Sequence, residues 1–121
     1  MRQPTIDILR DLLADEHAPC ISLYQPTHRT FPEKQQNPIR YKNLLREMQA
    51  STRKKYPTQD MQPILDKFED LTRDVEFWLR RTESLAILAS ANRFEVFDLQ
   101  RSVPELVIVA DSFHVKPFLR F

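Results

Sequence analysis

Basic residues gather in one segment of this chain. Positions 28–55 hold eight Lys and Arg residues against two acidic ones, although the formal net charge of all 121 residues is only +1. If the segment is helical, positions 42, 46, 49 and 53 fall within about 60° of one another around the helix axis. The residues at those positions are Lys42, Arg46, Gln49 and Arg53.

Three more cations flank this set. Arg29 and Lys34 stand in the polar stretch before the expected helix, and Arg40 stands at its start. Lys and Arg neutralise phosphates whatever the base sequence, and the ring of Tyr41 is a secondary candidate for stacking on a base. The pattern therefore predicts a strip that binds RNA phosphates. The alternatives are an ordinary solvated helix face for the cations and core packing for Tyr41.

The histidines and a nearby acidic residue are candidates for a metal site or an acid–base site. No two of the three histidines lie at metal-ligand spacing, and Cys20 is the only cysteine, so we expect no metal site. His28, Asp111 and His114 would form an acid–base cluster in a small hydrolase or nuclease if the strand ends that carry them were neighbours. The alternative is that they are ordinary surface residues near strand ends.

The chain contains no glycine, which excludes several catalytic motifs. A P-loop, a dinucleotide-binding turn and a nucleophile elbow all need glycine for left-handed backbone or for close approach to a phosphate. We therefore expect no catalytic residue, no cofactor and no enzymatic activity. The single cysteine, the short apolar runs and the charges in the first apolar stretch predict a cytoplasmic protein that does not enter a membrane.

The spacing of the apolar residues predicts the helices and strands that must position these side chains. A short helix is expected to open with Thr5 as its N-cap and to bury Ile6, Leu9 and Leu13. A strand follows at 20–24, then a polar connection at 27–37. The next helix is expected to begin with Asn37 as N-cap, to run to about 53, and to bury a stripe made of Tyr41, Leu44, Leu45 and Met48.

A second long helix is expected from about 58–60 to 79, because apolar residues recur every three or four positions over five turns. Three strands follow at 85–90, 93–99 and 106–113, with Asn92 expected to adopt left-handed geometry in the first turn. The element order α-β-α-α-β-β-β predicts a single α+β domain over residues 1–121. We expect a four-stranded, largely antiparallel sheet that ends in a meander, with two long helices packed on one face.

Several segments in this order resemble a known family. They are PCISLYQPTHR, QQNPIRYKNLLREM, LAILAS, RFEVFDLQ and PELVIVADSFHVKPFL. Together they are similar to the N-terminal domain of the bacterial relatives of archaeal and eukaryotic class-one peptide release factors. The resemblance implies a domain of a longer protein, with further domains on the same chain and the ribosome or ribosomal RNA as partner. The relatives are associated with ribosome rescue, quality control or dormancy.

The sequence departs from the family at the decoding motifs. The Asn-Ile-Lys-Ser loop falls near Asn37, which matches its first residue, but Lys-Ser is replaced. The Tyr-x-Cys-x-x-x-Phe element falls on Val107, Val109 and Phe113, of which only the phenylalanine matches. The hydrolytic Gly-Gly-Gln loop has no place in a glycine-free chain. The resemblance thus implies RNA contact without stop-codon reading.

The leading hypothesis is a non-catalytic RNA- or ribosome-binding domain. Its RNA-binding residues would be Arg29, Lys34, Asn37, Arg40, Lys42, Arg46 and Arg53. The alternative is a protein-interaction or homodimerisation module that uses an exposed sheet face and the apolar C-terminal segment.

Overall fold

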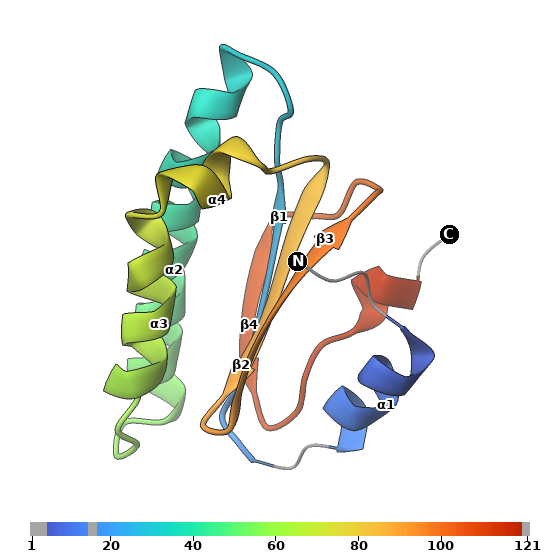
Figure 1. The fold of residues 1–121 in the computed structure, drawn as a ribbon. Helices are drawn as coiled ribbons and strands as arrows, with labels where there is room; N and C mark the ends of the chain where they lie inside the picture. The colour runs from blue at the N-terminus through green and yellow to red at the C-terminus, as the bar shows by residue number, and fades with distance from the viewer. Residues whose placement is uncertain (1–4, 15–16, 120–121) are drawn as a thin grey trace.

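A four-stranded antiparallel sheet lies between two layers, with helices from the middle of the chain on one side and the N-terminal helix and residues 111–119 on the other (Figure 1). The computed structural model describes residues 5–14 and 17–119. The strands are β1 (Cys20–Pro26), β2 (Ser84–Ser90), β3 (Arg93–Leu99) and β4 (Leu106–Ala110). The helices are α1 (Ile6–Ala14), α2 (Asn37–Lys55), α3 (Gln62–Thr72) and α4 (Val75–Leu79), with two short 3₁₀ turns at Glu33–Gln36 and Lys116–Leu119. The predicted α+β class and the two long helices on one face are confirmed.

The strand order is β3-β2-β1-β4, so the predicted closing meander is wrong. β2 and β3 form a hairpin, but β4 crosses to the far side of β1, where Val109 pairs with Ile21. Burial gives the reason. Residues 20–25 of β1 and all of β2 are buried, whereas β3 and β4 are mostly half-buried. A strand buried on both faces needs a neighbour on each side for its backbone groups, which leaves β3 and β4 as edges.

The β2–β3 turn corrects a second expectation. Ser90 pairs with Arg93, so only Ala91 and Asn92 connect the two strands. No residue in the described part of the chain has a positive φ, Asn92 included. A turn built without left-handed backbone has no need of glycine, which fits the composition.

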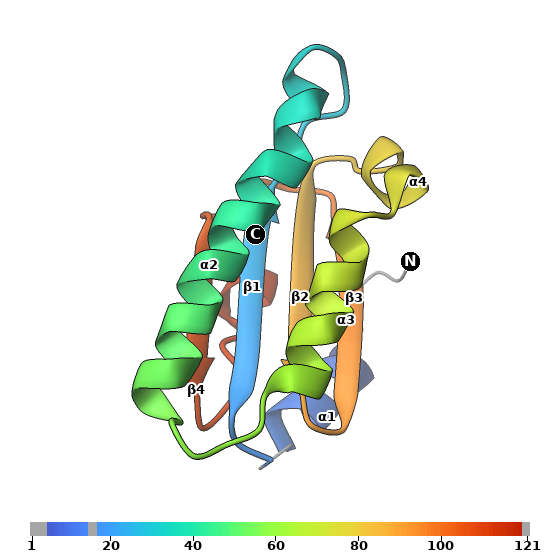
Figure 2. The same ribbon diagram turned by 90° about the vertical axis from the view of Figure 1, so that its left-hand side faces the viewer.

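On one face of the sheet, α2 and α3 cover the strands. Figure 2 shows α2 lying over the β1–β4 side and α3 over the β2–β3 side. The predicted stripe of α2 is confirmed, because Tyr41, Leu44, Leu45 and Met48 are all buried against Ile21, Leu23 and Val109 of the sheet and Phe68 of α3. Pro63 lies in the first turn of α3, where its missing N–H has no partner to lose.

The predicted single helix ending at 79 is interrupted. α3 ends at Thr72, and Asp74 has the extended backbone of an N-cap (φ −88°, ψ 90°) and accepts a hydrogen bond from the Phe77 N–H at 3.0 Å. The change of direction buries Phe77 and Trp78 and leaves Val75 70% exposed. The three- and four-residue period continues through the break, so period alone could not locate it.

The other face of the sheet is covered by α1 and the C-terminal segment. Leu12 of α1 packs with Phe113, Val115 and Phe118 against a second set of sheet residues that includes Tyr24 and Phe97. The predicted face of α1 is confirmed at Leu9, which packs inward together with Ile8, but it is wrong at Ile6 and Leu13, which are 69% and 57% exposed. The Thr5 N-cap is confirmed by the hydrogen bond from the Ile8 N–H to Thr5 Oγ1, 3.2 Å.

β4 ends at Ala110, three residues earlier than predicted, so that Phe113 turns back onto the sheet. Arg120 and Phe121, at the end of the apolar C-terminal segment, lie outside the described residues. Both faces of the sheet are thus covered in the described structure. The exposed sheet face that a protein-interaction module would need is not available.

Candidate nucleic-acid interface

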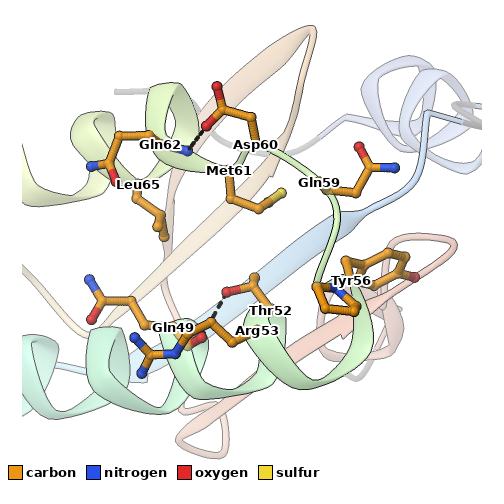
Figure 3. A pocket seen from close by; sticks show the side chains of 10 residues that line it. Gln49, Thr52, Arg53, Tyr56, Gln59, Asp60, Met61, Gln62 and Leu65 are labelled. Carbon is orange, nitrogen blue, oxygen red and sulfur yellow. Dashed lines mark hydrogen bonds between the residues drawn. The ribbon is translucent and has the colours of Figure 1, made fainter.

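The predicted basic strip lines a groove between α2 and α3. Lys42, Arg46 and Gln49 border a hollow of about 260 Å³ that Glu69 and Thr72 close from α3. A second hollow of about 360 Å³ follows toward the α2–α3 turn and includes Gln49, Thr52, Arg53 and Leu65 (Figure 3). Because Gln49 belongs to both, the two hollows adjoin along α2, and together we call them the seam groove. It places the four strip residues on one wall, as the helical spacing predicted.

Helix geometry explains the alignment. The stripe of Tyr41, Leu44, Leu45 and Met48 turns toward the sheet and α3, and positions 42, 46, 49 and 53 stand beside it on the α3 side. Lys42, Arg46 and Arg53 are exposed and Gln49 is half-buried. From position 42 to position 53 the wall extends over about 16 Å at 1.5 Å per residue.

The three cations of the seam groove have no carboxylate within 4 Å among the described residues. Arg46 donates to Asn43 Oδ1 at 2.7 Å, a neutral acceptor. The opposite wall brings two acids, Glu69 from α3 and Asp60 from the turn. Asp60 accepts from the Gln62 N–H at 3.1 Å, at the start of α3. The lining therefore carries three positive charges against two negative ones, with the positive charges on a single wall.

The other predicted cations lie elsewhere. Arg40 Nε lies 3.9 Å from Glu105 Oε1, which turns Arg40 toward the β4 edge and away from the seam groove. Arg29 donates to Gln100 Oε1 at 3.3 Å, and Lys34 Nζ donates to the Arg29 carbonyl at 3.4 Å. Arg29 and Lys34 thus stand in the loop of residues 27–36, at the tip of the molecule, drawn at the top of Figure 1. The seven predicted residues do not form one surface.

Asn37 is fully buried, and its side chain is occupied within the fold. Its Oδ1 accepts from the His28 N–H at 3.0 Å, its Nδ2 donates to the His28 carbonyl at 3.0 Å, and its own carbonyl accepts from Gln25 Nε2 at 2.8 Å. The predicted N-cap is wrong, since Asn37 is already helical and Gln36 holds the cap position without a side-chain bond. Asn37 therefore positions the tip loop and presents no amide to a partner.

Tyr41 belongs to the core. Its ring lies 5.0 Å from that of Trp78, and its hydroxyl donates to the Phe68 carbonyl at 2.8 Å. Burial, with a smaller contribution from Glu69, raises the pKa of Tyr41 above its ordinary value. A fully buried ring offers no face to a base, so Tyr41 is not a stacking residue.

The proposed acid–base cluster does not form. His28 follows the end of β1, whereas Asp111 follows β4, whose last residue Ala110 pairs with Cys20 at the start of β1. The two residues are separated by the length of β1, roughly 20 Å for seven extended residues. Asp111 instead accepts a hydrogen bond from the Tyr56 hydroxyl, and the His114 backbone is bonded to Ser22 and Tyr24. Hydrolysis by these three residues is excluded by the strand register.

A site that sequence reasoning missed lies at the tip. Phe31, Val75, Trp78 and Leu79 line a hollow of about 200 Å³ between the 27–36 loop and α4, with Lys34 among its lining residues. Phe31 is 60% exposed. The signal in the sequence was a single aromatic residue in an otherwise polar stretch. Phe31 alone could not predict the hollow, because the hollow also needs the break at Asp74, which turns Val75 and Leu79 outward.

In the described ranges, no group of three or more His, Cys, Asp or Glu residues is placed to hold a metal ion. Nor is any helix there both long enough and apolar enough to cross a bilayer. No protein-family model matches the chain, and no curated protein is significantly similar to it.

Proposed function

We propose that this chain is a non-catalytic RNA-binding domain whose seam groove holds phosphates of ribosomal RNA. The observation that carries the proposal is the alignment of Lys42, Arg46 and Arg53 on one wall without carboxylate partners among the described residues. Cations held in this way attract a polyanion, and each one that contacts a phosphate releases condensed counterions. The two acids on the opposite wall, Glu69 of α3 and Asp60 of the turn, repel phosphates and so favour their position on the α2 side.

The wider role rests on the resemblance to release-factor relatives. We propose that the domain docks a longer cytoplasmic protein on the ribosome during rescue, quality control or dormancy, without reading a stop codon. The buried state of Asn37 supports the last point, because the residue that matches the family's loop offers no free amide to a base. Any hydrolysis of peptidyl-tRNA would belong to other domains of that protein.

The alternative, a protein-interaction or homodimerisation module, would need an exposed face of the sheet. The sheet face that it required is covered by α1 and the segment from Phe113 to Phe118. The seam groove offers cations in its place, which favours a nucleic acid over a second copy of this nearly neutral chain.

The test is the salt dependence of binding. Replacing Lys42, Arg46 and Arg53 together by Ala is expected to weaken cosedimentation with ribosomes and binding to an RNA oligonucleotide. It is also expected to reduce the slope of log affinity against log salt by about two, at 0.7 per lost phosphate contact. Fluorescence anisotropy of a labelled oligouridylate at several salt concentrations measures both quantities.

Two controls make the result specific. Ala replacements at Arg10, Lys67 and Lys116 remove the same charge from exposed positions outside the seam groove and should leave the slope nearly unchanged. Glu69→Gln removes a negative charge from the opposite wall and should strengthen binding at low salt. An unchanged slope in the triple variant, or equal losses in both triple variants, would refute the seam groove as the RNA site.

A further inference from the structure

The hollow at the tip lies at the protein surface, yet it is lined mainly by apolar side chains. Phe31, Val75 and Leu79 border it, and they are 60%, 70% and 51% exposed. Half of the six large apolar side chains exposed in the described structure thus surround a single hollow. Clustered exposed apolar residues of this kind mark binding sites, whereas isolated ones are ordinary.

Hydrogen bonds anchor both elements that border this hollow. The Asn37 side chain clamps both backbone groups of His28 and so fixes the loop that carries Phe31. The Asp74 cap starts α4 in a new direction and turns Val75 and Leu79 outward. Trp78 forms the inner wall, where its Nε1 donates to the Leu71 carbonyl at 2.7 Å. The hollow is therefore bordered by elements that are anchored to the rest of the fold.

The tip hollow lies next to the seam groove. Thr72, at the end of α3, lines both the tip hollow and the hollow that contains Lys42 and Arg46. Lys34 is the only charged residue that lines the tip hollow, and it adds a cation at the same end. A chain of phosphates held along α2 would thus pass directly by an apolar hollow with an aromatic side chain at its border.

We propose that the tip hollow binds one unstacked base of single-stranded RNA, with Phe31 as its stacking surface and Lys34 beside the neighbouring phosphate. The inference rests on the proposed function and adds to it the class of RNA that is bound. Bases in a duplex are stacked and paired, so only a single strand, loop or end can place a base in such a hollow. The lining has few polar groups to read a base edge, so binding should tolerate any base.

An apolar side chain of a protein is the competing occupant. RNA is favoured by the shared residue Thr72, which places the hollow next to the cationic groove, and by Lys34 at its border. An apolar protein contact would gain nothing from that proximity. The experiment below separates the two.

The test uses Trp78, the only tryptophan of the chain, as a reporter within the hollow. Twelve-nucleotide oligouridylate is titrated into the full 121-residue chain, and both Trp78 fluorescence and anisotropy of labelled RNA are followed. We expect a Trp78 signal that saturates with binding. We also expect at least about fivefold weaker binding of an abasic ribose-phosphate oligomer of equal length, because stacking of a base is lost.

Three variants define the hollow. Phe31→Leu keeps an apolar side chain but removes the ring, and it should weaken binding of oligouridylate at least about fivefold while leaving the salt slope unchanged. Phe31→Tyr keeps the ring and should bind as the original chain does. Ile39→Ala is the matched control, since Ile39 is an exposed apolar residue near the tip that lies outside the described hollows.

The outcomes distinguish this inference from the proposed function. If the original chain binds neither oligouridylate nor duplex RNA, the proposed function fails, and the tip inference fails with it. A different result is that binding depends on Lys42, Arg46 and Arg53 while the abasic oligomer binds as tightly as oligouridylate and Phe31→Leu binds as the original chain does. That result overturns only the tip inference, and it would assign the tip hollow to an apolar side chain of a protein partner. A duplex that binds as tightly as the single strand, with the same loss in Phe31→Leu, also overturns it.

Discussion

At the scale of single residues, buried polar groups decide which positions remain free for a ligand. Asn37 and Tyr41 both carry groups that recognise nucleic acids in other settings, yet both are fully buried and bonded within the chain. A buried polar group without a partner is costly, so each is retained where its bonds can be made. Among the described residues, the cations of the seam groove have no carboxylate partner within 4 Å, which leaves their charge available to an external anion.

Tyrosine ionisation gives a prediction at this scale. The chain has three tyrosines, and each has a raised pKa: Tyr24 and Tyr41 through burial, and Tyr56 mainly through its hydrogen bond to Asp111, which raises its pKa to about 12. The folded chain therefore holds protons that the unfolded chain releases at about pH 10. The stability that these phenols contribute is complete below that pH and falls as pH rises above it; the contribution of Tyr56 is lost as pH passes through about 12, and those of Tyr24 and Tyr41 are lost at higher pH.

Tyrosinate absorbance of the folded and urea-unfolded chain measures this effect. The unfolded chain should ionise at about pH 10, and the folded chain should show no step there. Tyr56→Phe should remove the ionisation step near pH 12 and leave the ionisation of Tyr24 and Tyr41 unchanged. A step at about pH 10 in the folded chain would contradict the raised pKa values.

At the scale of elements, the break between α3 and α4 has the largest functional consequence. The break turns α4 away from the direction of α3 (Figure 1), and residues of α4 and of the 27–36 loop together line the tip hollow. Arg81, two residues after the end of α4, secures the new direction through a 3.1 Å ion pair with Asp98 of β3 and by lying 3.8 Å from the centre of the Phe77 ring. The apolar hollow exists only because the helix is broken here.

The break depends on the cap at Asp74, which can be tested by urea denaturation. Asp74→Ala should lower the free energy of unfolding by about 1 kcal/mol, the usual value of a lost N-cap, and Asp74→Asn should retain most of it. Asp70→Ala is the matched control, because Asp70 forms only an exposed ion pair with Arg73 and should change stability little. Equal effects of Asp74→Ala and Asp70→Ala would show that the cap does not hold the break.

At the scale of the whole molecule, the sheet joins two apolar layers. One contains Trp78 and the helices α2 and α3, and the other contains Phe118, Phe113 and Leu12. β1 and β2 contribute side chains to both layers, because successive residues of a strand point to opposite faces. We therefore expect the two layers to unfold together, although no helix passes between them.

Phe118→Ala tests this coupling across the sheet. Phe118 is 5% exposed and its ring contacts those of Phe97 and Tyr24, so its removal should cost about 3 kcal/mol or more. Trp78 fluorescence, which reports the opposite layer, and far-ultraviolet circular dichroism should show the same lowered midpoint. The control Ile6→Ala, at a 69% exposed position, should change little. Two separate transitions, or an unchanged Trp78 midpoint, would show that the layers are independent.

The sequence by itself determined the features that depend on local pattern. Hydrophobic period located α2 and its buried stripe, the change of period at residue 84 marked the start of the β-rich part, and helical spacing aligned Lys42, Arg46, Gln49 and Arg53. The absence of glycine was matched by a β2–β3 turn without left-handed backbone. These features follow from residue type and from the 3.6- and 2-residue repeats, which act over a few neighbouring positions.

Only the tertiary structure decided the features that depend on what lies opposite. β4 pairs with β1 because a strand buried on both faces needs two neighbours, and no local pattern records that demand. The same holds for Arg40, whose ion pair with Glu105 turns it toward the β4 edge. It also holds for His28 and Asp111, which lie at opposite ends of β1, and for the tip hollow that Phe31 and Val75 border. Burial and pairing are properties of contacts between distant segments, so they exist only once the chain has folded.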